Sequence, residues 1–117
     1  MQDYLQITFL GVEHSDAVES RIRSKVAGLE HYGQHIISCR VTVDAPHQQH
    51  HKGILYSVCI DLRLQNGEIV VNREHRHDHA HEDVYAAIRD AFDAAGRQLD
   101  NHARRVRGDV KRHEAQA

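Results

Sequence analysis

The chain has 117 residues, of which 40% are hydrophobic and 5% aromatic, and its formal net charge is −2 with the histidines neutral. This length fits one domain, the composition excludes a disordered chain, and no apolar run reaches the roughly 20 residues of a membrane helix. The N-terminus lacks a basic region followed by a cleavage site, so we expect no secretory signal and a cytoplasmic protein.

The first predicted elements are a strand and a helix. The alternation in "DYLQITFLG" predicts a strand whose inward side is Leu5, Ile7 and Phe9. In "HSDAVESRIRSKVAGLEHYG", Ser15 or Asp16 is the expected N-cap, and Gly33 is the expected C-cap. The apolar residues of this segment recur at helical spacing and predict a buried stripe of Val18, Ile22, Val26 and Leu29.

Three further strands are predicted, over "IISCRVTVDA", "ILYSVCIDLRL" and "EIVVNREH". The dipeptide Asn66-Gly67 predicts a type I′ hairpin turn between the last two, because both residue types tolerate positive φ. This turn sets a register in which Leu64 faces Ile69 and Val58 faces His75. The same register separates the two cysteines onto opposite sheet faces, so we expect reduced thiols and no disulfide.

The last predicted element is a long helix that begins after Asp83, its expected N-cap, and ends at about Val106. Its predicted buried stripe is Val84, Ile88, Ala91, Ala95, Leu99 and Val106, with Phe92 at the border. The pattern predicts one α+β domain of order β-α-β-β-β-α, with both helices packed on one face of a four-stranded sheet. We assign this domain to residues 1–107 and expect a basic, frayed or disordered tail at 108–117.

Catalytic and cofactor-binding signatures do not occur in the sequence. The glycines are scattered, and none belongs to a GxGxxG or phosphate-loop motif. Neither Cys39 nor Cys59 lies in a recognisable catalytic motif. We therefore expect a binding protein rather than an enzyme, without a cofactor and without a small-molecule substrate.

Basic side chains gather on the outer faces of both predicted helices. From Arg104 to the end, five basic and two acidic residues give a net charge of +3, which leaves −5 for the rest. Such a surface suits the phosphates of structured RNA, although an ordinary solvated helix face is the alternative. The candidate RNA-binding residues are Arg23, Lys25, Arg89, Arg97, Arg104, Arg105, Arg107 and Lys111.

A second candidate site is "NREHRHDHAHED", which has a histidine at every second position. Histidines two apart on a strand can chelate zinc or nickel, and the loop "PHQQHHKG" is expected at the same end of the sheet. A metal- or pH-responsive binding site, a rim that binds RNA more tightly as pH falls, and solvated loops all stay open. The candidate ligands, none of them assigned, are His75, His77, His79, His50 and His51.

The segment "HEDVYAAIRDAFDAAGRQL" resembles the second-helix signature of the ribosome hibernation-promoting factor and ribosome-associated translation inhibitor family, also called sigma-54 modulation proteins. The residues that carry the resemblance are His81-Glu82-Asp83, Tyr85-Ala86-Ala87-Ile88 and Arg97-Gln98-Leu99. The segment "KVAGLEHYGQHI" is similar to the end of that family's first helix. The resemblance covers about Leu5 to Arg105.

This resemblance implies a stress or stationary-phase factor that binds rRNA in the decoding channel of the small ribosomal subunit. It implies inhibition of translation by occlusion, without catalysis. The chain has no long C-terminal extension, so the resemblance implies the short, monomeric type. Family members usually carry rRNA-contacting lysines where this chain has Gly28, Ala94 and Asn101, which leaves more of the RNA contact to its arginines.

Overall fold

The computed structural model describes residues 4–32, 35–45, 56–73 and 83–116, with side chains described except at 32, 73 and 107–116. The elements are β1 (Leu5–Leu10), α1 (Asp16–Leu29), a 3-10 turn η1 (Glu30–Tyr32), β2 (Ile36–Asp44), β3 (Ser57–Leu64), β4 (Gly67–Arg73) and α2 (Val84–Gln116). This is the predicted order, and the α+β class is confirmed.

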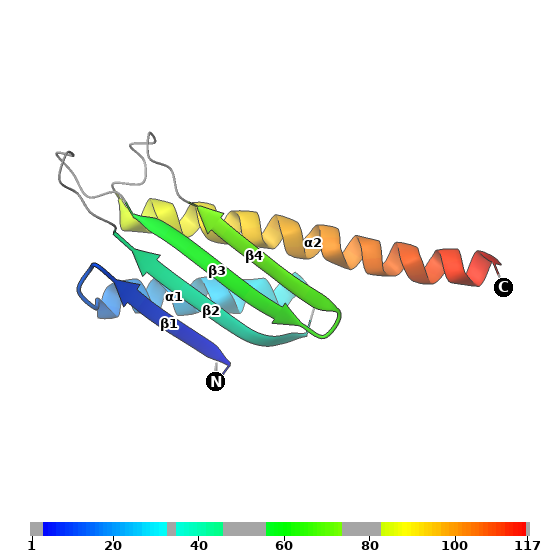
Figure 1. Cartoon of the computed structure of the whole chain (residues 1–117), viewed down its shortest axis with the longest axis horizontal. Coiled ribbons are helices and arrows are strands. Elements are labelled where there is room, and N and C mark those ends of the chain that lie inside the picture. The colour runs from blue at the N-terminus through cyan, green and yellow to red at the C-terminus, as the bar shows by residue number, and fades with distance from the viewer. Residues whose placement is uncertain (1–3, 33–34, 46–55, 74–82, 117) are drawn as a thin grey trace.

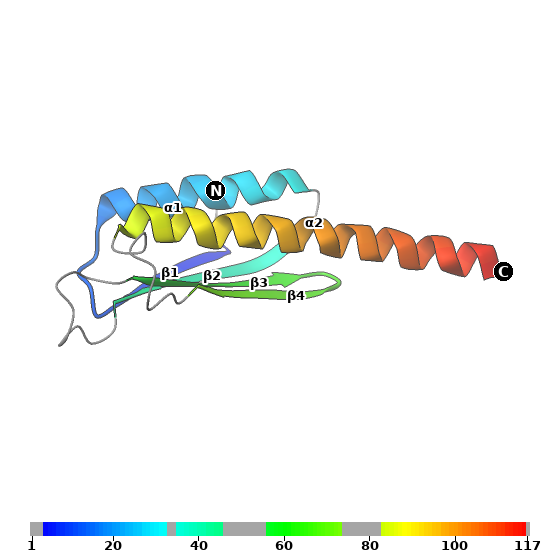
Figure 2. The ribbon, with the colours of Figure 1, turned by 90° about the horizontal axis from the view of Figure 1, so that it is seen from above.

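The molecule has two layers, a sheet and a pair of helices. The strands lie in the order β1-β2-β3-β4, with β1 parallel to β2 and the other neighbours antiparallel (Figure 1). Both helices cover the same face of the sheet, as predicted (Figure 2). The opposite sheet face is left without a helix and is called the open face below.

The core lies between the helices and the covered face of the sheet. The predicted strand alternation is confirmed, because every second residue is buried from Cys39 to Val43 in β2 and from Val58 to Leu64 in β3. Ile36, at the start of β2, is buried out of this phase because the register shifts between Ile36 and Ser38. The inward residues of β1 are only partly buried, since β1 is an edge strand. The largest fully buried side chains are Ile22, Val26, Cys39, Val41, Val43, Val58, Ile60, Leu62, Ile88 and Leu99.

Each helix starts on a side-chain cap. Ser15 is the N-cap of α1, and its hydroxyl accepts a hydrogen bond from the backbone N–H of Val18 at 3.2 Å. Asp83 holds the start of α2, because its Oδ1 accepts from the N–H of Tyr85 at 2.9 Å. The expected C-cap Gly33 lies outside the described residues; α1 itself ends at Leu29 and continues into η1.

The predicted hairpin register is wrong by two residues. Leu64 pairs with Gly67 rather than with Ile69, so the turn consists of Gln65 and Asn66. A type I′ turn is excluded, because no described residue other than a glycine has positive φ. The even shift keeps the same side chains on the core face. It also pairs Val58 with Arg73, which corrects the prediction that Val58 faces His75.

The reason for this register lies under the turn. Gly67 has φ +151°, and a Cβ placed there would lie 3.3 Å from Cε1 of His102 on α2. The shifted register therefore places a residue without a side chain against His102 of α2. The local preference of Asn-Gly for a type I′ turn yields to this tertiary contact.

The prediction that the last helix ends at about Val106 is also wrong. α2 has 33 residues and continues to Gln116, a length of about 50 Å at the usual rise per residue. Its C-terminal part projects past the sheet (Figures 1 and 2). A single glycine, Gly108, costs a helix only about 1 kcal/mol relative to alanine, and no proline follows it. The domain boundary at residue 107 stays a prediction.

Candidate nucleic-acid interface

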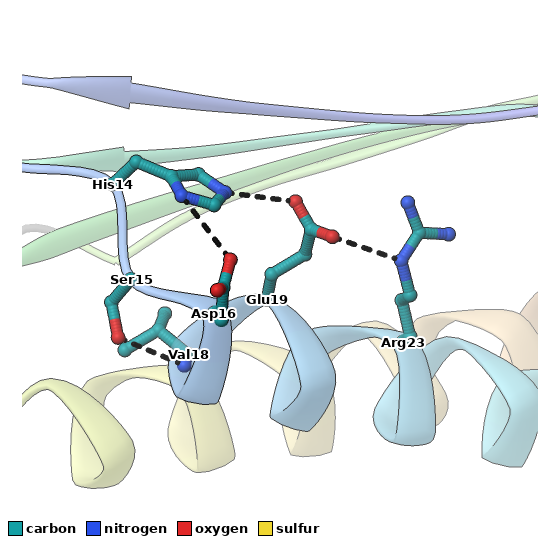
Figure 3. A network of polar contacts seen from close by, with 6 residues as sticks. All are labelled: His14, Ser15, Asp16, Val18, Glu19 and Arg23. Atoms are coloured by element: carbon teal, nitrogen blue, oxygen red, sulfur yellow. Dashed lines mark hydrogen bonds and ion pairs between the residues drawn. The ribbon is translucent and has the colours of Figure 1, made fainter.

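The basic residues of α1 begin beside a polar network at the start of that helix. Glu19 lies between two partners, with Oε1 3.1 Å from His14 Nε2 and Oε2 accepting from Arg23 Nε at 3.4 Å (Figure 3). The hydrogen bond from His14 and the ion pair with Arg23 hold the pKa of Glu19 below its usual value. Arg23 is exposed to solvent, and its guanidinium is already paired with the carboxylate of Glu19.

His14 ties this network to the sheet. Its Nδ1 lies 3.5 Å from Asp16, and its ring meets the ring of Phe9 edge-on, with centroids 5.0 Å apart. Phe9 belongs to β1, so the contact fixes the segment between β1 and α1. The network orients the first turn of α1.

A cation–π contact joins the two helices. The guanidinium carbon of Arg21 lies 5.0 Å from the centroid of the Tyr85 ring, at the start of α2. Lys25, one turn further along α1, is half-buried. Of the cations of α1, Arg21 therefore contacts α2 directly.

The outer face of α2 carries alternating charges. Arg89 lies 3.3 Å from Asp90, and Arg104 lies 3.0 Å from Asp100 one turn before it. Both pairs are exposed, so each stabilises the helix by at most a few tenths of a kcal/mol. Arg97 is exposed and makes no ion pair with any residue that the structure describes.

The last three candidate RNA-binding residues differ in whether the structure describes their side chains. Arg105 is exposed and, within the described part of the chain, has no acidic partner. Arg107 and Lys111 lie on the projecting part of α2, and their side chains fall outside the described residues. Of the predicted RNA-binding residues, the structure brings Arg104 and Arg105 to one groove.

That groove lies between the start of β4 and the middle of α2, is open to solvent, and has a volume of about 520 Å³. It is lined by Glu68, Ile69, Gln98, Asn101, Arg104 and Arg105. The sequence reasoning missed Glu68 and did not assign Gln98 or Asn101 to a site. The sequence contained a feature that could have pointed to two of these residues. Gln98 lies in the Arg-Gln-Leu signature, and Asn101 stands where the family resemblance implies a lysine.

The positions expected to carry lysine in the family differ in their surroundings. Gly28 is exposed with open space where a Cβ would lie, and Asn101 is exposed as well. Ala94 is 2% exposed and belongs to the core cluster. A lysine at 94 would have to bury its charge, so in this chain only 28 and 101 are surface positions.

The histidine candidates for a metal site are not described. His50, His51, His75, His77 and His79 all lie outside the described residues. Within the described residues, no group of three or more histidine, cysteine or acidic side chains could hold a metal ion. Metal binding by these histidines stays a prediction.

The two cysteines are free, as predicted. Burial raises the pKa of Cys39 to about 12, and burial also raises the pKa of the half-buried Cys59. Both are protonated at neutral pH, which makes them poor nucleophiles. In the part of the chain that the structure describes, no helix is both long and apolar enough to cross a membrane.

Comparison with known proteins agrees with this fold. The family model described as "Sigma 54 modulation protein / S30EA ribosomal protein" matches residues 5–107. The crystal structure of the Thermus thermophilus Protein Y N-terminal domain is 22% identical, with a TM-score of 0.66 over 87% of this chain and 99% of that one.

A second solved structure, a ribosomal subunit interface protein from Coxiella burnetii, is 16% identical, with a TM-score of 0.63 over 85% of this chain and 96% of that one. No curated protein matches the chain. At these identities the two structures show a shared fold, and the family match covers most of the sequence. The chain therefore belongs to the sigma 54 modulation protein / S30EA ribosomal protein family.

Proposed function

We propose that this protein is a non-catalytic cytoplasmic factor that binds rRNA of the small ribosomal subunit as a monomer. In this proposal it occupies the decoding channel and inhibits translation by occlusion under stress or in stationary phase. The observation that carries the proposal is the family match over residues 5–107. The structural similarity to a ribosomal subunit interface protein supports it.

The distribution of charge supports RNA as the direct partner. Exposed arginines follow the outer face of α2, at positions 89, 97, 104 and 105, and the helix continues past the sheet with a basic sequence. A long helix with exposed arginines suits structured RNA, which is recognised mainly by shape and by phosphate contacts.

The ion pairs of α2 determine how readily each arginine can bind a phosphate. A phosphate must displace Asp100 before Arg104 is fully available, whereas Arg97 and Arg105 face no acidic partner among the described residues. We therefore assign the larger share of the RNA affinity to Arg97 and Arg105. The nearby carboxylates reduce the local positive potential and compete with phosphate for Arg89 and Arg104, which weakens binding.

Co-sedimentation with purified small subunits through sucrose gradients tests the proposal. We expect the full chain to sediment with the subunits at low salt, and the double variant Arg97→Glu/Arg105→Glu to remain near the top. Absence of the wild-type chain from the subunit fractions at low salt would refute the proposal.

The matched control changes the same charge on the open face of the sheet. Arg40 and Arg63 are exposed there, in β2 and β3. The variant Arg40→Glu/Arg63→Glu should sediment like the wild type if the helices make the contact. Equal loss of binding in both double variants would mean that net charge, rather than the helix surface, determines binding.

A further inference from the structure

β4 is an edge strand, and its free side borders the groove of about 520 Å³. The groove is lined by Glu68 and Ile69 of β4 but by no residue of β3, so it lies on the side of β4 that has no neighbouring strand (Figure 1). Among the described residues, the backbone of β4 pairs only with β3. Backbone N–H and C=O groups at alternate residues of β4 therefore point away from the sheet and are available to a further strand.

One side of α2 faces this groove. Gln98, Asn101 and Arg105 lie three and four residues apart, and this spacing puts them on one face of the helix. Arg105 is exposed and has no acidic partner among the described residues, and Arg104 adds a second cation at the groove. Side chains that donate hydrogen bonds and carry positive charge suit carboxylates. This side of α2 is therefore placed to contact acidic side chains of a strand added to β4.

Packing at the start of β4 fixes the width of the groove. A Cβ at Gly67 would lie 3.3 Å from Cε1 of His102, so α2 and β4 are in close contact beside the groove. Leu99 of α2 and Ile69 of β4 belong to the same buried cluster. A template that core packing already holds in place loses little conformational entropy when a strand is added.

The open face of β4 suits a different kind of side chain. Val70 alternates with the buried Ile69, so it lies on the open face, where it is 53% exposed. A β-branched side chain of an added strand would lie beside Val70 and cover it. Glu68 is exposed on the same face and would repel a carboxylate there. The carboxylates of an added strand therefore belong on the α2 side, and its apolar residues belong on the open face.

We infer that this groove binds an extended acidic segment of a partner protein, which adds a further strand to the sheet beside β4. Carboxylates alternate with β-branched residues in this segment, and the carboxylates face Arg104 and Arg105. Backbone hydrogen bonds supply the affinity, and the alternation supplies the specificity. The inference goes beyond the proposed function and does not depend on it. Arg105 is shared with the proposed RNA surface, so a bound segment lowers the affinity for RNA.

Fluorescence anisotropy with two labelled heptapeptides, blocked at both ends, tests the inference on the full chain. TEVEVET has the required alternation, and TEEEVVT has the same composition and charge without it. We expect TEVEVET to bind about tenfold more tightly, because TEEEVVT turns one carboxylate toward the open face and loses its charge-assisted contact. Equal affinities, or no binding of TEVEVET, would overturn the inference.

Two matched variants locate the contact. Arg105→Ala should weaken the binding of TEVEVET by about tenfold, because it removes the unpaired cation of the groove. Arg40→Ala removes the same charge from the open face of β2 and should leave the affinity unchanged. Equal losses in the two variants, or no loss in Arg105→Ala, would contradict binding in the groove.

Amide hydrogen exchange followed by NMR shows whether a strand is added. TEVEVET should slow the exchange of alternate amides of β4, whereas the amides of β1, at the opposite edge of the sheet, should exchange as before. Binding that leaves the β4 amides unprotected would overturn the inference.

The same exchange measurement distinguishes other occupants. If labelled hexauridylate RNA protects the same β4 amides, RNA is the occupant and the inference is overturned. If the free chain is a dimer with these amides already protected, a second copy is the occupant and the inference is overturned as well. Protection by TEVEVET alone in a monomeric chain supports it. Small-subunit co-sedimentation is measured separately, and its failure refutes the proposed function but not the peptide site.

Discussion

The two halves of α2 differ in what surrounds them. Residues 84–99 lie over the sheet and contribute most of the helix's buried side chains, including Ile88, Phe92 and Leu99. In residues 100–106, only Ala103 is buried, and from there the helix projects past the sheet with a basic sequence. One helix therefore serves first as a core element and then as a projecting segment with a basic sequence.

The difference teaches that an apolar stripe shows where a helix is covered and not where it ends. The first half is stabilised by tertiary packing, whereas the second half depends on local helix propensity and exposed ion pairs. Stability should therefore depend on the buried side chains of the first half of α2, and RNA binding should depend on the exposed cations from Arg97 onward.

The largest expected effect is loss of packing in the covered half. Leu99→Ala removes a fully buried side chain and should lower the free energy of unfolding by about 2–5 kcal/mol. Val106→Ala, at a half-buried position in the second half, should cost less than about 1 kcal/mol. Urea denaturation measures both, and equal costs would mean that the core extends to the end of the helix.

A second test uses the dry core beneath both helices. The pKa of Cys39 is about 12 in the folded protein and 9.0 when unperturbed, so only the unfolded chain loses its proton between these values. The contribution of Cys39 to the free energy of unfolding is complete below pH 9. It falls by up to about 4 kcal/mol as pH rises toward 12.

Urea denaturation of the wild type and of Cys39→Ala across pH 8 to 11 measures this loss. The variant should show the shallower decline, because other groups that titrate at high pH are common to both proteins. Parallel declines would mean that water reaches Cys39 in the folded state.

Two substitutions by lysine, one in each half of α2, compare the halves directly. Ala94→Lys places a charge in the core and should destabilise the fold by roughly 3 kcal/mol, whereas Asn101→Lys at an exposed position should stay within about 0.5 kcal/mol. Thermal unfolding followed by circular dichroism distinguishes them. Similar melting temperatures would contradict the burial of residue 94.

The smallest expected effect comes from removing the projecting end. A chain that stops after Arg107 loses Lys111 and Arg112 but no described core residue. Its stability should be unchanged, while the salt dependence of subunit binding should fall by a log–log slope of about one to two. Unchanged salt dependence would mean that residues 108–117 make no contact with RNA phosphates.

Much of the fold could be predicted because it depends on local patterns. Period-two alternation identified the buried faces of β2 and β3. Residue type and position identified Asp83 as a cap and limited the first cap to Ser15 or Asp16, of which the structure uses Ser15. The hairpin register failed because the contact that favours the observed one is not local: a side chain at Gly67 would press on His102, 35 residues further along the chain. Turn chemistry alone favoured the other register.

The site could be predicted only in part for the same reason. Helical spacing identified the outward arginines of α2, but it could not distinguish Ala94, which is buried, from Asn101, which is exposed. The groove was missed because it joins Glu68 of β4 to Arg105 of α2. Only the tertiary packing of that helix on the sheet edge creates it.

The parallel pairing of β1 with β2 has a consequence for the order of folding. The three strands β2, β3 and β4 are antiparallel sequence neighbours, and the β3–β4 connection is a two-residue turn. β1 can join only after α1 has formed a long crossover, which carries a larger loop-closure entropy.

Once docked, β1 is tied at its start by Tyr4, whose hydroxyl donates to Glu30 and whose carbonyl accepts from Cys39. As an edge strand with partly buried side chains, β1 should be the last strand to form and the first to exchange its amide hydrogens with solvent.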